Sequence, residues 1–214
     1  MREVYGDWDA PGWAPKPLPA GEAGEHPSGQ RRYLWVDAFG VLNFVALAEG
    51  AAAAEDAQRL LQAAARLIRA VHDCLGTPRS AALPMREAAD GGFEGLRIGK
   101  ERARRASDAG MELDGMYWHY LDKWLFALAR YGRAAGDAAA VGRGLRLVRQ
   151  VHPRFLARGP GGEPLGLRWK MNADLTTIPG HERAGPSGDA VAGLVAYAAL
   201  ERARASVGPA GDEG

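Results

Sequence analysis

The sequence predicts an all-α fold built from repeated helix hairpins. Apolar residues recur at helical spacing in several long segments, which is typical of helices with one buried face. Two of these segments share a phrase, RLIRAVH at 66–72 and RLVRQVH at 146–152. The offset between the two copies is 146 − 66 = 80 residues. A repeat of this length indicates a unit that stacks on its neighbours to bury its apolar face.

The composition is that of a globular protein, with 47% hydrophobic and 25% charged residues in a chain of 214. The formal net charge of +1 leaves no electrostatic attraction to nucleic acid or to an anionic membrane, so we expect neither as a partner. No stretch approaches the roughly 20 apolar residues of a membrane span. The single cysteine, Cys74, cannot form an internal disulfide, and the N-terminal residues have no apolar run typical of a signal peptide. We therefore expect a cytoplasmic protein.

The chain divides into three parts by composition. Residues 1–30 are rich in Pro and Gly and are expected to form an extended or disordered lead-in, with Trp8 and Trp13 either docked on the body or loosely held. Residues 31–205 are predicted to form the helical-hairpin domain, and 206–214 a disordered tail.

The helices in this domain are predicted from their apolar periodicity and from their stop signals. Gly76 and Pro78 end the second helix, while Gly142, Gly144 and Pro153 weaken the fourth. The predicted ranges are 32–49, 55–75, 114–131, 137–156 and 189–205.

Long polar stretches, 79–113 and 157–188, separate the hairpins. They share a second phrase, GLRI at 95–98 and GLRW at 166–169, at an offset of 166 − 95 = 71. The repeating unit is thus helix, short turn, helix and long loop, and the last helix begins a third copy. Equivalent loops of stacked hairpins fall on one face, which is where we expect function.

Six segments occur in collinear order over about residues 31–200: RRYLWVDAFGVLNFVALAE, AVHDCLG, GLRIGK, DGMYWHYLDKWLFALAR, LRWKMNADL and GDAVAGLVAY. In these segments the chain resembles a group of bacterial and fungal proteins with the six-hairpin glycosidase-like fold. The resemblance implies a partial (α/α) toroid.

The same resemblance carries expectations about function and assembly. The superfamily includes glycoside hydrolases, unsaturated-uronyl hydrolases and sugar epimerases. A closed toroid of six hairpins requires a longer chain, and this one holds two hairpins and part of a third. Because an open end of stacked helices exposes apolar surface, we expect a homo-oligomer, most simply a two-fold dimer.

Three acids lie near the starts of the predicted inner helices: Asp37, Asp114 and Asp189. A pair of carboxyl groups is the usual equipment for glycoside hydrolysis. An acid at a helix start also caps free N–H groups, and we assign Asp189 to that role. Asp37 lies a turn inside its helix and is the first candidate for a catalytic acid or base, with Asp114 as its partner. His119 is the candidate for an assisting base.

Aromatic and basic residues near the same helix ends are candidates for binding a sugar, whose C–H faces stack on aromatic rings. An alternative is that Tyr117 belongs to a core stripe and that the basic residues are solvated loop charges. The basic residues in each repeated loop would bind a carboxylate or phosphate. The candidate substrate-binding residues are Trp35, Tyr117, Trp118, Arg97, Lys100, Arg168, Trp169 and Lys170.

We expect no metal and no cofactor. No pair of histidines has metal-ligand spacing, and the Gly-rich stretches match no phosphate-binding fingerprint. His72 and His152 occupy equivalent positions of the repeat, which favours a structural role in capping helix carbonyls.

Two functions follow from these observations. The first is a carbohydrate-active enzyme, hydrolase-like or epimerase-like, that acts on a small saccharide. The alternative is a non-catalytic helical scaffold that binds a ligand or a protein partner through its concave face. A different chemistry on the same fold is a third possibility that no residue singles out.

Overall fold

The computed structural model describes residues 1–208 apart from 16–31, 80, 82–83, 100–113 and 186. Five long helices form its body, and one hydrophobic core runs through them. They are α2 (Leu34–Glu49), α3 (Ala54–Leu75), α4 (Trp118–Ala135), α5 (Ala138–Phe155) and α6 (Ser187–Val207), and a short helix, α1 (Arg2–Tyr5), precedes them.

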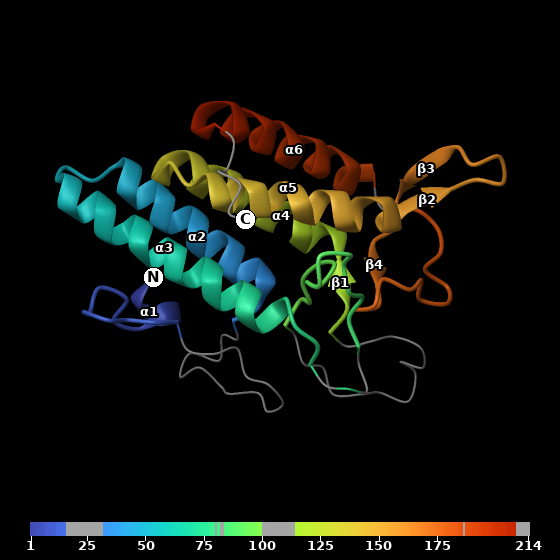
Figure 1. Ribbon diagram of the computed structural model, residues 1–214, viewed down its shortest axis with the longest axis horizontal. Coiled ribbons are helices and arrows are strands. Elements are labelled where there is room, and N and C mark those ends of the chain that lie inside the picture. Colours follow the sequence, from blue (N-terminus) through green and yellow to red (C-terminus); the bar gives the residue numbers. More distant parts are fainter. Residues whose placement is uncertain (16–31, 80, 82–83, 100–113, 186, 209–214) are drawn as a thin grey trace.

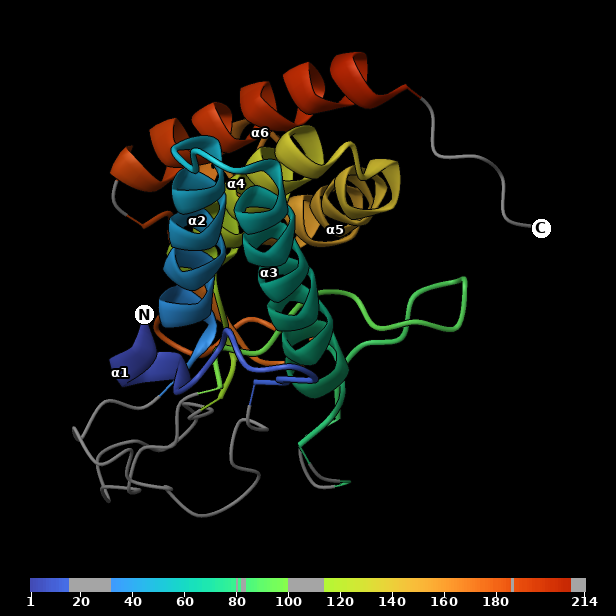
Figure 2. The ribbon, with the colours of Figure 1, turned by 90° about the vertical axis from the view of Figure 1, so that its left-hand side faces the viewer.

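The helices form two layers. The inner helices α2, α4 and α6 contact one another in that order, α3 packs against α2, and α5 packs against α4. Figure 1 shows α6 above the α4–α5 pair and the α2–α3 pair below it, and Figure 2 shows α2 and α3 side by side with α4 and α5 behind them. This order confirms the all-α prediction of a partial (α/α) toroid made of two hairpins and the first helix of a third.

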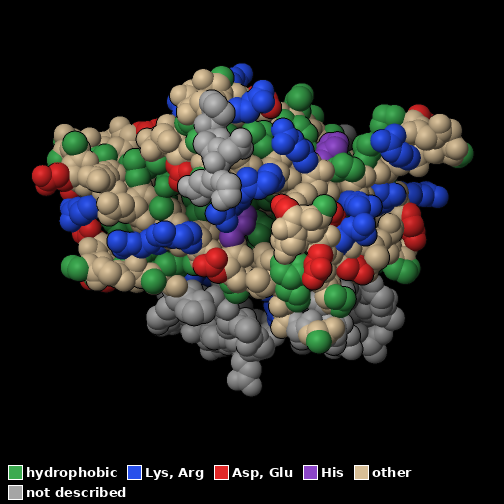
Figure 3. All heavy atoms as spheres, in the orientation of Figure 1, with side chains coloured by type: hydrophobic (Ala, Val, Ile, Leu, Met, Phe, Trp, Pro, Cys, Tyr) green, Lys and Arg blue, Asp and Glu red, His purple; other side chains and the backbone are tan. Residues whose placement is uncertain are grey.

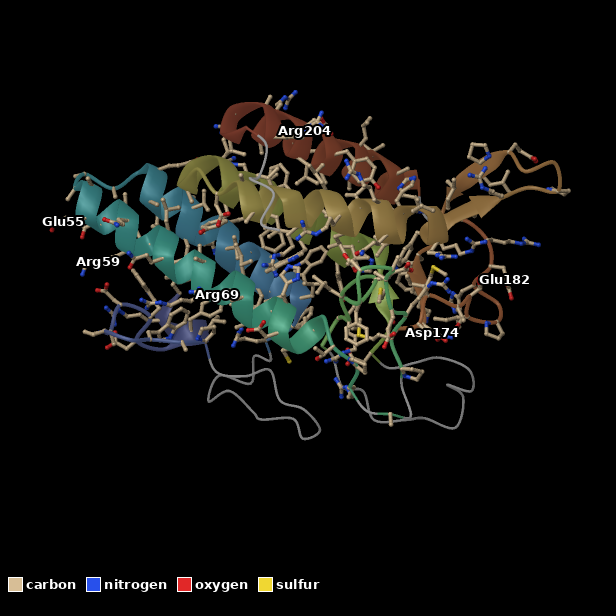
Figure 4. The ribbon with its side chains drawn as sticks, viewed as in Figure 1. Glu55, Arg59, Arg69, Asp174, Glu182 and Arg204 are labelled. Carbon is tan, nitrogen blue, oxygen red and sulfur yellow. The ribbon has the colours of Figure 1, made fainter. Side chains whose placement is uncertain are left out.

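The outer helix α3 shows why the sequence folds in this way. Its apolar residues, spaced three and four apart, are buried, and among them Leu67 and Val71 have no exposed surface. Its charged residues Glu55, Arg59 and Arg69 project away from the core (Figure 4). The inner helix α4 is buried on more than one side, because α2, α5 and α6 all contact it.

The loops contain short strands that the all-α prediction did not include. Strand β1 (Met116–Tyr117) pairs with β4 (Lys170–Met171), and β2 (Leu156–Arg158) pairs with β3 (Pro164–Leu167), both antiparallel. The β1–β4 pair explains why α4 begins at Trp118 and not at the predicted residue 114. It also joins the two long loops at one end of the helices, as the repeat predicted.

The first 15 residues pack on the body, which agrees with docking, one of the two alternatives for Trp8 and Trp13, while residues 16–30 of the predicted lead-in lie outside the described residues. The rings of Trp8 and Trp13 pack against Phe44 at centroid distances of 5.3 and 6.3 Å. Tyr5 approaches so closely that a Cβ at Gly40 would lie 2.0 Å from its hydroxyl oxygen. The chain therefore covers one side of α2 with its own N-terminal segment. At the other end α6 continues to Val207, two residues beyond the predicted domain boundary.

Backbone hydrogen bonds reproduce the sequence repeat. After each hairpin, the loop returns to the end of the outer helix: the Arg97 N–H donates to Leu75 O at 2.9 Å, and the Arg168 N–H donates to Phe155 O at 2.7 Å. The carbonyl oxygen of the next loop residue in each copy then accepts a hydrogen bond from the first residue of an inner helix. Leu34 N–H donates to Ile98 O, and Trp118 N–H donates to Trp169 O, both at 3.0 Å.

The two repeated histidines do not make the expected contacts with helix carbonyls among the described hydrogen bonds. Each one bonds an aromatic side chain of the next inner helix instead. Trp124 Nε1 on α4 donates to His72 Nε2 at 3.1 Å, and the Tyr197 hydroxyl on α6 contacts His152 Nδ1. The sequence repeat at 66–72 and 146–152 therefore corresponds to a contact that recurs between neighbouring hairpins.

Candidate functional site

An aromatic cluster lies where the N-terminal ends of α2 and α4 meet the second long loop. Because Leu34 and Trp118 begin their helices in the same way, the residues that follow them, Trp35 and His119, occupy equivalent positions. The β1–β4 pairing then holds the second loop beside the start of α4. We call the following residues the aromatic cluster: Trp35, Tyr117, His119, Tyr120 and Trp169.

The rings of the cluster touch one another around His119. Its ring centroid lies 5.8 Å from Trp35, 4.2 Å from Tyr120 and 6.0 Å from Trp169, with the Trp169 ring nearly parallel at 21°. Trp169 Nε1 donates a hydrogen bond to His119 Nδ1 at 3.1 Å. An Nδ1 that accepts a hydrogen bond carries no proton, so this contact assigns the proton of neutral His119 to Nε2.

Two lysines approach the faces of these rings. Lys123 Nζ lies 5.7 Å from the Trp35 ring centroid. Lys170 Nζ lies 5.8 Å from that of Tyr117 and 5.6 Å from that of Trp169, although Lys170 is only 2% exposed. These distances are within the range of cation–π attraction. The cluster is thus an aromatic surface with positive charge at two of its edges.

Two carboxyl groups adjoin Lys123. Asp122, on α4, is 1% exposed, and its Oδ1 accepts a hydrogen bond from Lys123 Nζ at 2.6 Å. Asp189 lies in the first turn of α6. The Oδ2 atoms of both acids are buried and have no hydrogen-bond partner among the described residues. Burial raises the pKa of both carboxyl groups, and the nearby charge of Asp189 raises that of Asp122 further.

The first-choice acid, Asp37, lies outside this cluster. It is fully buried; Arg32 donates to Oδ1 and Oδ2 at 2.9 Å each, and the Tyr5 hydroxyl donates to Oδ1 at 3.1 Å. Burial raises the pKa of Asp37, while Arg32 and Tyr5 act in the opposite direction. These contacts tie the N-terminal segment and the start of α2 together, which is a structural role.

The second predicted acid, Asp114, is also engaged in the body. It is 3% exposed, and its Oδ2 forms ion pairs with Arg97 and with Arg79. Its Oδ1 accepts a hydrogen bond from Gly99 N–H at 2.6 Å. The structure therefore holds Asp37 and Asp114 in separate buried ion pairs and does not bring them together as an accessible acid–base pair.

The loop arginines cap helices, which differs from the predicted role in binding an anion. Arg97 Nη2 donates to Cys74 O at 2.6 Å, and Arg168 Nη1 donates to Arg154 O at 2.9 Å. These are equivalent carbonyls at the ends of α3 and α5, and carbonyls in the last turn have no partner inside a helix. The repeated GLR phrase is thus a C-terminal capping device.

Two further predicted binding residues are placed differently. Trp118 has no exposed surface, and its Nε1 donates to Asp189 O at 3.1 Å, so its ring faces are covered by protein and do not form a stacking surface. Lys100 lies outside the described residues. Trp35, Tyr117, His119, Trp169 and Lys170 are the predicted site residues that the structure brings together.

A hollow of about 290 Å³ adjoins the cluster between α1 and α2, and Trp35, Phe39 and Asn43 contribute to its wall.

In the described part of the chain, no group of three or more His, Cys, Asp or Glu side chains could hold a metal ion. Across the same residues, no helix has the length and apolar character needed to span a bilayer.

Comparison with known proteins gives a fold relationship. No family model and no curated protein matches the chain. Among solved structures, the chain is similar to the cellobiose 2-epimerase of Spirochaeta thermophila, with 19% sequence identity and a TM-score of 0.50. The match covers 82% of this chain and 41% of the epimerase, so this chain spans less than half of that protein. At this identity the likeness establishes the helical-toroid fold and not the activity.

Sequence reasoning missed Tyr120, Asp122 and Lys123. The sequence does carry a signal for Asp122. It is seen when the two hairpins are aligned by the first residues of α2 and α4, at an offset of 118 − 34 = 84. Asp122 takes the place of the buried Ala38, and an acid at a core position is unusual. Likewise Trp169, 42% exposed, stands where the first copy has Ile98, 3% exposed. Such departures from the repeat are the signal in the sequence by which these positions could have been found.

Proposed function

We propose that this chain binds a small saccharide at the aromatic cluster and processes it by acid–base chemistry. The observation that carries the proposal is the exposed Trp169 ring, held nearly parallel to His119 by a hydrogen bond. An exposed tryptophan beside other rings, with lysines at the edge, suits a polar ring-shaped ligand that has apolar C–H faces. The toroid fold shared with a cellobiose 2-epimerase supports this choice of ligand class.

His119 and Asp189 are the proposed proton-transfer groups. Histidine is a common proton-transfer residue in enzymes, and Nε2 of His119 carries the proton in the neutral form. Burial raises the pKa of Asp189, so its carboxylate is a stronger base than that of an exposed aspartate; we assign it to accept the proton that the reaction removes, while His119 Nε2–H donates the proton that is returned. Asp122 is too buried to reach a ligand, and we assign it to the positioning of Lys123.

The two proposed proton-transfer groups could serve either of two reactions. Epimerisation beside a carbonyl removes a proton from carbon and returns one to the opposite face. Hydrolysis needs one acid to protonate the leaving oxygen and one base to activate water. The fold neighbour favours epimerisation as the first reaction to test.

Binding is tested by titrating the protein with cellobiose while the indole N–H signals are followed by NMR. We expect saturable shifts of the Trp169 signal, with a dissociation constant in the range of about 1 mM. Trp169→Ala should weaken binding at least about tenfold. Leu165→Ala is the matched control, because Leu165 is 58% exposed on β3 and lies outside the cluster. The absence of saturable binding, or equal binding by both variants, would refute the saccharide site.

Turnover is tested by incubating cellobiose with the protein in D₂O. Epimerisation by proton exchange gives a product with deuterium at the inverted carbon, whereas hydrolysis gives two monosaccharides. We expect His119→Asn to slow turnover about 100-fold or more while cellobiose affinity changes little. An unchanged rate would remove His119 from the reaction.

We also propose that a second copy of the chain covers the free face of α6. Three apolar residues lie there at helical spacing: Val191, Leu194 and Val195 are 63%, 67% and 53% exposed. The inner helices α2 and α4 each have an outer partner, whereas α6 has none among the described residues. A two-fold axis would place the same stripe of each copy against the other, which buries both. More than half of the fold neighbour has no counterpart in one copy of this chain.

Light scattering over a range of protein concentrations tests this assembly. We expect a dimer that Leu194→Asp converts to a monomer. Leu47→Asp is the control, because Leu47 is 49% exposed on α2 and lies outside the stripe. A wild-type monomer at every concentration would exclude the dimer, and equal effects of both variants would exclude α6 as its interface.

A further inference from the structure

A polar hollow on the outer side of the helices has no role in the site described above. Its volume is about 310 Å³, and it lies between the end of α3, the middle of α5 and the loop at 90–96. Figure 3 shows Lys and Arg side chains gathered beside a histidine near the middle of this side of the molecule. The charged and polar side chains that line the hollow are His72, Asp73, Asp90, Arg143, Arg146 and Gln150.

Two arginines on one wall of the hollow, Arg143 and Arg146, are not paired with an acid among the residues that the structure describes. Arg143 and Arg146 lie three residues apart on α5, so both side chains project from the same face of the helix. Neither forms an ion pair with a carboxylate in the described part of the chain. Other arginines of the fold do, including Arg130 with Glu49 and Arg154 with Glu94.

The first copy of the repeat shows the contact that an arginine at this position makes with a neighbouring segment. Arg66 is the counterpart of Arg146 in the first copy of the repeated phrase. Its Nη1 donates to the carbonyl oxygen of Trp13, in the N-terminal segment that packs against α2 and α3. Arg146 forms no such hydrogen bond with the described residues, and its side chain is exposed.

His72 adds a third donor to the same hollow. Trp124 Nε1 donates to His72 Nε2, so the proton of the neutral ring is on Nδ1. Burial, followed by the charges of Arg143 and Arg146, lowers the pKa of His72 to about 3. The ring is therefore neutral near pH 7, and its Nδ1–H group is a donor with fixed orientation.

We propose that this hollow binds a small oxyanion group, a phosphate or a carboxylate, through Arg143, Arg146 and the Nδ1–H of His72. Arginine donors in a fixed fork match the planar edge of a carboxylate or two oxygens of a phosphate. The opposite side of the hollow carries the carboxylates of Asp73 and Asp90, and Asp90 Oδ1 accepts a hydrogen bond from Gly92 N–H at 3.1 Å. These acids repel a bare anion but accept hydrogen bonds from hydroxyl groups, so they favour an oxyanion attached to a hydroxylated body.

The test is a pair of titrations of the full chain at constant ionic strength, one with inorganic phosphate and one with gluconate. Chemical shifts of the His72 ring and of the arginine Nε–H groups are followed by NMR. We expect saturable shifts with at least one probe, and the tighter probe identifies phosphate or carboxylate as the preferred group. Arg143→Gln and Arg146→Gln should each weaken binding about tenfold or more.

Arg149→Gln is the matched control, because Arg149 is exposed on α5 and does not line the hollow. It should leave the affinity unchanged. The proposal is overturned if neither probe gives saturable shifts up to about 10 mM. It is also overturned if Arg149→Gln weakens binding as much as the two variants in the hollow, since that result indicates general attraction of anions to the helix.

Discussion

Trp169 Nε1 donates a hydrogen bond to His119 Nδ1 at 3.1 Å, across 50 positions of sequence. The donor belongs to a loop between two short strands, and the acceptor lies at the second residue of α4. The pairing of β1 with β4 brings them together. One exposed indole thus sets the tautomer of the histidine that we assign to proton transfer, and it also supplies the surface on which a sugar would stack.

Trp169→Phe is expected to change the tautomer balance of His119. The substitution keeps an aromatic ring but removes the Nε1–H donor, so Nδ1 loses the bond that keeps it unprotonated. Because Trp169 is 42% exposed, the free energy of unfolding should fall by less than about 1 kcal/mol. The ¹⁵N shifts of the His119 ring report the tautomer directly. If they match those of the wild type, the hydrogen bond does not control His119.

Asp37→Asn is expected to destabilise the fold by about 3 kcal/mol, because it leaves the guanidinium of Arg32 without its buried partner. If Asp37 were the catalytic acid or base that the sequence suggested, the same change would abolish turnover with little loss of stability. Urea unfolding measures the difference. Tyr5→Phe, which removes one hydrogen bond to Asp37, should cost about 1 kcal/mol. A fully stable Asp37→Asn variant without turnover would restore Asp37 as a catalytic candidate.

His72 is expected to make the fold less stable as the pH falls below about 6.5. Its pKa is about 3 in the folded state, below the ordinary value of 6.5, so the unfolded chain binds a proton more readily. The stability from neutral His72 is present above pH 6.5 and is lost as the pH falls from there toward 3. Between pH 7 and 5 the loss is roughly 2 kcal/mol.

The control for this effect is His72→Gln, which has no titrating group at that position. Its free energy of unfolding should change less between pH 7 and 5 than that of the wild type, by roughly the same 2 kcal/mol. Denaturant titrations at the two pH values give this difference. Identical pH dependence in both proteins would show that His72 is protonated in the folded state as easily as in the unfolded chain.

Gly193→Val is expected to destabilise the contact between α4 and α6 by about 1–3 kcal/mol. A Cβ at Gly193 would lie 3.1 Å from Cζ2 and 3.2 Å from Nε1 of the buried Trp118. Gly188→Val is the matched control on the same helix, because no atom lies within 4 Å of its Cβ position. Thermal unfolding of the two variants separates the packing effect from helix propensity. Similar melting temperatures would mean that Trp118 moves aside without cost.

The sequence by itself determined the layout of the fold. Helical periodicity and the stop at Gly76 located the long helices, and the phrases shared by 66–72 and 146–152 identified the hairpin repeat. The periodicity and the stop signal are local, since each depends on residues within one or two helical turns, and the repeat is found by comparing two such segments. They also identified Trp35, Tyr117, His119 and Trp169 as candidate site residues, because polar and aromatic side chains near helix ends are visible without the fold.

Only the tertiary structure decided which side chains are engaged with one another. Asp37 and Asp122 are both acids near the starts of inner helices, yet one is held by Arg32 and the other adjoins Lys123 and Asp189. Arg97 and Arg168 have the composition of an anion site, yet they cap helices because the loops fold back onto the ends of α3 and α5. These outcomes depend on contacts between residues far apart in the chain, and hydrophobic spacing carries no information about them.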